Sequence, residues 1–155
     1  MHKSSKIFIA FIAVAATAFT YSLYVGKEQI QVRKEDYAKY ASATTIIQEG
    51  GDSKEALDNL DELSKKYGDV TDILLNKALA NLRLGDFAKV KENLEALIEG
   101  DKEQEANSGI MLLYAEASIE SNDKEKAKEI LNKVSQLELD EKDQEKLQEL
   151  TQKVE

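Results

Sequence analysis

Cysteine, proline and tryptophan are absent from this 155-residue chain, and histidine occurs once. Without cysteine there is no disulfide framework, no thiolate metal site and no cysteine nucleophile. The one histidine, His2, stands at the N-terminal end, so the commonest general base and metal ligand is missing from the rest of the chain. We therefore expect no catalytic residue, no cofactor and no enzyme activity.

Acidic residues outnumber basic ones, 30 to 21, for a formal net charge of −9. Such a surface repels phosphate groups, so nucleic acid is not an expected partner. The acidic runs contain no D-x-D-x-D-G loop and alternate with lysine, so a metal site is not expected either. The residue types that form helices readily, alanine, leucine, glutamate and lysine, are abundant. The predicted fold class is all-α.

The longest uncharged stretch covers residues 7–25 (IFIAFIAVAATAFTYSLYV) and follows a basic tail over residues 1–6. As a helix it would reach about 28 Å, the thickness of a bilayer's hydrocarbon core. We predict a transmembrane signal anchor there, then a juxtamembrane helix over residues 26–36. The predicted location is the cell membrane, single-pass, with the soluble domain outside the cytoplasm.

Two other interpretations of the apolar stretch stay open. The triplet Ala16-Thr17-Ala18 resembles a signal-peptide cleavage site, and cleavage near Ala18 would release a secreted chain. A buried core helix is the third interpretation. The anchor is favoured because apolar residues continue past the cleavage site to a full spanning length. Lys27 and Arg33 on the far side oppose the predicted orientation, since basic residues favour the cytoplasmic side.

A repeated segment is the most informative pattern. Three stretches, starting at Gly51, Gly85 and Asn122, share a turn residue, then aspartate, then a small residue (Ala or Val) four positions after it. The starts lie 34 and 37 residues apart, a period typical of stacked helical repeats. Apolar residues at helical spacing flank each turn, which predicts a pair of helices around it.

These features resemble the tetratricopeptide repeat, a pair of antiparallel helices. The likeness is strongest at Leu84-Gly85-Asp86-Phe87, which is similar to the family's inter-helix turn. The family usually has a large side chain where Asn81 and Ser118 stand. The resemblance implies a helical-repeat solenoid over residues 37–136, in three repeats over 37–70, 71–107 and 108–136, closed by a C-terminal capping helix over 137–155.

Aspartates mark the expected helix starts, because their side chains can accept hydrogen bonds from the first backbone amides of a helix. The predicted N-caps are Asp52, Asp69, Asp86, Asp101, Asp123 and Asp140. The extra residues of the longer spacing are expected between residues 100 and 107, where an insertion costs little. Asn122 can replace glycine at the third turn, since asparagine tolerates a left-handed backbone.

In tetratricopeptide proteins the first helix of each pair lines a concave groove for peptides or partner helices. The resemblance assigns this role to Leu75, Leu79, Leu82 and Arg83 in the second repeat and to Leu112, Glu116 and Ile119 in the third. The leucines of residues 74–84 cannot all occupy one core stripe of a helix. Either some of these leucines face the groove, or neighbouring helices bury both sides of this helix. Both interpretations stay open.

The expected function is a membrane-anchored protein–protein interaction module. Its expected role is an adaptor or chaperone-like accessory for protein export or envelope assembly, by analogy with anchored tetratricopeptide proteins. The alternatives are a structural subunit of a larger membrane complex and a cleaved, secreted repeat protein. The expected partners are a protein segment in the groove and the membrane through the span. No small-molecule substrate is expected, and a homo-oligomer stays open.

Overall fold

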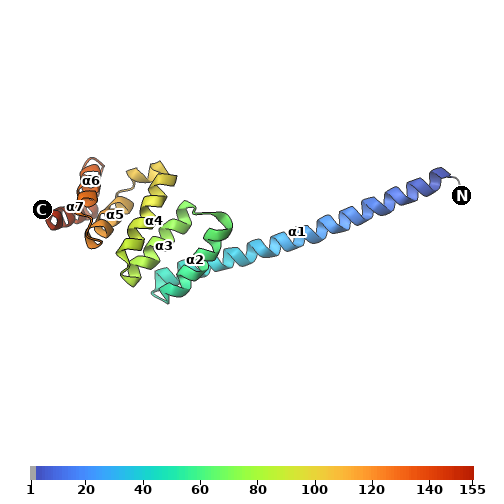
Figure 1. The fold of residues 1–155 in the computed structure, drawn as a ribbon, viewed down its shortest axis with the longest axis horizontal. Helices are drawn as coiled ribbons and strands as arrows, with labels where there is room; N and C mark the ends of the chain where they lie inside the picture. Colours follow the sequence, from blue (N-terminus) through green and yellow to red (C-terminus); the bar gives the residue numbers. More distant parts are fainter. Residues whose placement is uncertain (1–2) are drawn as a thin grey trace. The chain divides into compact units, whose positions relative to one another are not determined.

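The computed structural model describes the backbone of residues 3–155 and the side chains of residues 25–155. The described chain is all helical and contains no strand, which confirms the predicted all-α class. The helices are α1 (Lys3–Glu49), α2 (Ser53–Tyr67), α3 (Thr71–Leu84), α4 (Phe87–Gly100), η1 (a 3-10 helix, Lys102–Ala106), α5 (Ser108–Glu120), α6 (Lys124–Val134) and α7 (Glu141–Val154) (Figure 1).

The chain divides into two compact units, residues 1–39 and residues 40–155. The first unit is the N-terminal part of α1, which passes through Gly26 without a break. The basic tail and nearly all of the anchor predicted over residues 7–25 lie outside the residues with described side chains. Over the side chains that are described, no helix has both the length and the apolarity needed to cross a membrane. The predicted juxtamembrane segment, residues 26–36, is part of α1.

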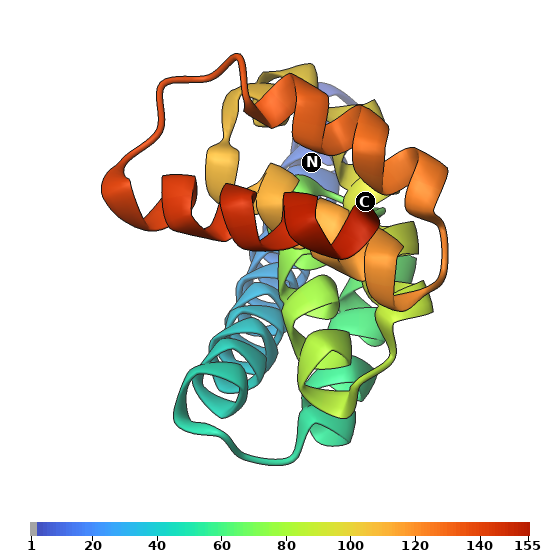
Figure 2. The same cartoon turned by 90° about the vertical axis from the view of Figure 1, so that its left-hand side faces the viewer.

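The second unit is a stack of antiparallel helix pairs. Helix α3 pairs with α4 and α5 with α6, while α2 contacts α3 and α4 contacts α5. Helix α7 contacts both α5 and α6 and lies across them at the C-terminal end of the chain (Figure 2). The pairs α3–α4 and α5–α6 fall within the second and third repeats expected from the sequence.

Two apolar cores hold this unit together. The last turns of α1 pack with α2 and α3 around Leu60, and α3 to α7 surround a larger core. Four alanines of the helix pairs are fully buried: Ala56, Ala78, Ala115 and Ala127. Leu60, Leu94, Leu97 and Leu150 are at most 1% exposed, and burying one such side chain contributes about 1.5–3 kcal/mol.

Five of the six predicted aspartate N-caps are confirmed. The side chains of Asp52, Asp86, Asp123 and Asp140 each accept a hydrogen bond from a backbone amide of the helix that follows. Asp101 caps the 3-10 helix η1, which takes up the extra residues between α4 and α5. Asn107 then caps α5. Each such cap contributes about 1 kcal/mol to helix stability.

The predicted N-cap at Asp69 is wrong. Val70 occupies the N-cap position of α3, without a side-chain cap. The Asp69 carboxylate accepts instead from the Ser64 hydroxyl of α2. The Ser64 hydroxyl competes with the first backbone amides of α3 for this carboxylate, because a short carboxylate side chain can accept a hydrogen bond from either nearby donor.

The departures from the family pattern have simple local explanations. Asn122 has φ 66°, the left-handed conformation predicted for it, and Gly85 has φ 72° at the preceding turn. Asn81 and Ser118 are buried, yet each donates a hydrogen bond within its own helix. Asn81 donates to the Lys77 carbonyl at 2.9 Å and Ser118 to the Tyr114 carbonyl at 2.8 Å. Small polar side chains therefore fit where the family usually packs a large one.

Candidate functional site

Helices α5 and α7 border an open cleft of about 500 Å³. Its apolar part comes from α5, through Leu112 and Leu113. Its charged rim comes mainly from α7. The lining residues are Gly109, Leu112, Leu113 and Glu116 of α5 with Lys142, Asp143, Glu145, Lys146 and Glu149 of α7.

Helical spacing places these residues on facing sides of the two helices. Intervals of three, four and seven residues put side chains on one face of a helix, and both sets of lining residues follow them. The two helix starts are joined across the cleft, because the Ser108 hydroxyl donates to the Asp143 carboxylate. Asn107 caps α5 and Asp140 caps α7 beside this contact.

An ion pair crosses the cleft. The Lys146 Nζ atom lies 2.8 Å from Glu116 Oε1 and 3.4 Å from Glu149 Oε2. The hydrogen bond to Glu116 is the largest cause of a raised Lys146 pKa, so the ammonium is held in its charged form. Four carboxylates face two ammonium groups in the lining, which leaves the cleft acidic.

The predicted groove residues of the third repeat reach this cleft in part. Leu112 and Glu116 line it. Leu112 is only 3% exposed, so it forms the floor rather than a projecting contact. Ile119 is half-buried, packs against the larger core and does not line the cleft.

The predicted groove residues of the second repeat lie elsewhere. Leu75 and Leu82 are half-buried against the larger core, and Leu79 packs against the smaller one. None of them lines the α5–α7 cleft. Arg83 reaches back to α1, where its guanidinium donates to the Ile47 carbonyl. The second-repeat leucines therefore contribute to packing on both sides of α3.

Sequence reasoning missed the contribution of α7. The segment was expected only as a capping helix, and its Leu147, Leu150 and Val154 do face the core. The same helix carries Lys142, Lys146 and Glu149 at helical spacing on another face. That spacing could have indicated a charged face on this helix, but it cannot show which other helix lies opposite that face.

The cleft shows no arrangement for metal binding. No group of three or more histidine, cysteine, aspartate or glutamate side chains is placed to hold a metal ion anywhere in the described residues. The carboxylates of the cleft are spread along two helices, and two of them bond Lys146 instead. The arrangement offers an apolar floor, several fixed charges and room for a ligand.

The family model for the tetratricopeptide repeat matches residues 81–151. This range runs from the end of α3 into α7 and contains every residue that lines the cleft. No curated protein matches the chain. The match supports the tetratricopeptide resemblance drawn from the repeated turns, and tetratricopeptide repeats generally bind protein partners.

Proposed function

We propose that the protein is a binding module that holds a segment of another protein in the cleft between α5 and α7. The observation that supports this most is the cleft itself, about 500 Å³ with an apolar floor and a charged rim, inside the matched repeat region. Apolar contact area provides affinity, while fixed charges select and orient the partner. The acidic lining favours a partner segment with basic residues beside an apolar one.

The proposed role is binding without catalysis. A nucleophilic lysine needs a lowered pKa, so that its amine is neutral near pH 7. The pKa of Lys146 is raised instead, because Glu116 bonds its charged form. Lys146 therefore provides a stable charge for recognition rather than an activated nucleophile.

The module is further proposed to work at a membrane, as an adaptor or chaperone-like accessory for protein export or envelope assembly. The uncharged stretch over residues 7–25 supports the anchor, and the order of anchor and repeats supports the role. Alkaline extraction of membranes and the intact mass of the chain test the anchor. A soluble chain that begins near Phe19 would contradict it.

Site-specific photo-crosslinking tests the cleft as the partner site. A photoreactive residue at Lys142, on the rim, should give a defined protein adduct in the cells that make the chain. The same group at Glu125, exposed on α6 and outside the cleft, should not give that adduct. The adduct at Lys142 should then disappear when Gly109→Gln fills the cleft.

Gly109→Ala is the matched control for the filled cleft. A Cβ atom at Gly109 would meet only Asn107 Oδ1, at 3.5 Å, which is ordinary contact. Either substitution should leave the fold intact, as measured by circular dichroism, and only the longer glutamine should block the partner. An adduct that persists in Gly109→Gln, or appears equally from both positions, would refute the proposed site.

A second candidate function is a structural subunit of a membrane complex. It is favoured by large apolar side chains that are exposed on α1: Ile30 is 58%, Val32 42% and Tyr37 74% exposed. A permanent subunit would cover such residues in the assembly. Gentle detergent extraction should then give a complex of fixed stoichiometry that Ile30→Ser dissociates. Extraction as a lone chain would exclude this candidate.

A further inference from the structure

A second cavity, of about 130 Å³, lies among α4, η1, α5 and α6 and shares no lining residue with the α5–α7 cleft. Its apolar part is buried and comes from Ile98, Met111 and Ile130. The cavity is larger than the space one water needs. The other lining residues are Tyr114 and the charged groups Glu95, Glu99, Lys102, Glu105, Lys126, Glu129 and Lys133.

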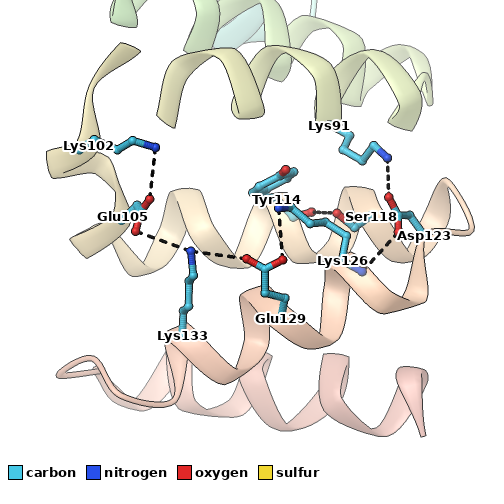
Figure 3. Close-up of polar contacts among 9 residues, drawn as sticks. All are labelled: Lys91, Lys102, Glu105, Tyr114, Ser118, Asp123, Lys126, Glu129 and Lys133. Atoms are coloured by element: carbon cyan, nitrogen blue, oxygen red, sulfur yellow. Dashed lines mark hydrogen bonds and ion pairs between the residues drawn. The ribbon is translucent and has the colours of Figure 1, made fainter. Parts of the chain in front are cut away.

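Tyr114 supplies an unsatisfied polar group to this cavity. The side chain rises from α5 toward α4 and is 4% exposed (Figure 3). Its hydroxyl makes no hydrogen bond of normal distance and angle among the described residues, although the Glu95 carboxylate lies near enough to raise its pKa. A buried hydroxyl without a partner is unfavourable and is rare in native proteins. A ligand that bonds this oxygen would remove the penalty.

The unmatched charge of the lining is negative. Lys133 lies 3.7 Å from Glu105 and 3.6 Å from Glu129, and Lys102 lies 3.6 Å from Glu105 (Figure 3). Lys126 lies 3.4 Å from Glu129, so all three lysines of the lining have carboxylate partners.

The two remaining carboxylates form no ion pair with any described residue. Glu95 and Glu99 stand one turn apart on α4, where like charges repel each other. Four carboxylates therefore face three ammonium groups around the cavity. The group that would balance the lining is a single positive charge.

We propose that this cavity binds a small organic ammonium ion. The ammonium group lies between Glu95 and Glu99 and donates a hydrogen bond to the Tyr114 oxygen. The Tyr114 hydroxyl can then donate its own hydrogen to Glu95. The alkyl part of the ligand covers Ile98 and Met111. An organic ion fits better than a divalent metal, because no set of three metal-ligating side chains is placed together in the described chain.

The test is a titration of the full-length protein in detergent micelles with n-butylammonium chloride, followed by backbone amide NMR signals. Saturable shifts at Glu95, Glu99 and Tyr114 are expected. At equal concentrations, 1-butanol and sodium butyrate match the ligand in size without its positive charge, and sodium chloride controls for screening. These three should give no saturable shift at the same signals.

Two variants assign the binding to the proposed groups. Tyr114→Phe and Glu95→Gln should each weaken n-butylammonium binding at least fivefold. Glu103→Gln removes an exposed carboxylate of η1 that does not line the cavity, and it should leave the affinity unchanged. Equal binding of 1-butanol, unchanged affinity in Tyr114→Phe with intact helicity, or no saturable shift at all would each overturn the proposal. The last result would mean that the cavity holds water only.

Discussion

Lys91 and Asp123 join consecutive repeats through one carboxylate that also starts a helix. The Lys91 Nζ atom of α4 lies 2.7 Å from Asp123 Oδ2, and Asp123 Oδ1 accepts from the Lys126 backbone amide at 3.3 Å as the N-cap of α6 (Figure 3). The bond from Lys91 is the largest cause of a lowered Asp123 pKa. The third inter-helix turn is thus held both by its own helix and by the repeat before it.

Substitutions at Asp123 should separate these two roles. Asp123→Asn keeps a good N-cap and loses the ion pair, so the free energy of unfolding should fall by about 0.5 kcal/mol, the usual size for a solvent-screened pair. Asp123→Ala loses the cap as well and should lower it by about 1–2 kcal/mol in total. Urea denaturation followed by circular dichroism measures both. Equal losses would show that the cap is energetically unimportant.

The pH dependence of the same contact has a defined sign. Because the folded-state pKa of Asp123 is lowered, its stabilising effect is complete above the unfolded-state pKa. The effect is lost as the pH falls through the folded-state pKa. Lys91→Met should therefore lower the free energy of unfolding at neutral pH, and the difference from the natural chain should shrink in acid. A difference that grows with acidification would contradict this assignment.

Gly109→Ala should stabilise the protein. Gly109 lies in the first turn of α5, where a Cβ atom meets nothing closer than 3.5 Å. Alanine loses less backbone entropy than glycine on entering a helix, a gain of about 0.5 kcal/mol near a helix end. Thermal unfolding measures the change. A lower melting temperature would mean that the first turn of α5 requires glycine.

Arg83 should matter for stability rather than for partner binding. Its guanidinium bonds the Ile47 carbonyl at the end of α1, and a hydrogen bond of this kind from a solvent-exposed side chain contributes about 0.5–1.5 kcal/mol. Arg83→Met keeps most of the side-chain volume and should lower the free energy of unfolding by that amount. Crosslinking from Lys142 should be unchanged in this variant. Lost crosslinking in a folded variant would instead support the groove role expected from the sequence.

Tyr114 should ionise later in alkali than an ordinary tyrosine does. Burial is the largest cause of its raised pKa, and the negative charge of Glu95 adds to it. Stability from this group is complete below the unfolded-state pKa, near 10, and falls as the pH rises above it. Tyrosinate absorbance during an alkaline titration should show one late ionisation that Tyr114→Phe removes. An unchanged titration would assign the late ionisation to another tyrosine.

Local signals in the sequence predicted the helices well. Repeated turns at Gly51, Gly85 and Asn122 predicted helix pairs, and aspartates predicted most of the helix starts. These features involve residues a few positions apart, whose interactions are nearly the same in any fold that keeps the helix. The N-cap predicted at Asp69 was wrong even at this short range, because the Asp69 carboxylate accepts a hydrogen bond from the Ser64 hydroxyl.

The sequence by itself determined the all-α class, the repeat and the acidic surface, since these depend on composition and on contacts within one helix pair. Only the tertiary structure decided that Glu116 faces Lys146 across a cleft, that Arg83 bonds α1, and that the Tyr114 hydroxyl is buried without a hydrogen bond of normal distance and angle. The two contacts join residues 30 and 36 positions apart, and the burial of the Tyr114 hydroxyl likewise depends on neighbouring helices. They depend on how each helix is rotated against its neighbours, which side-chain packing determines and helical periodicity alone does not.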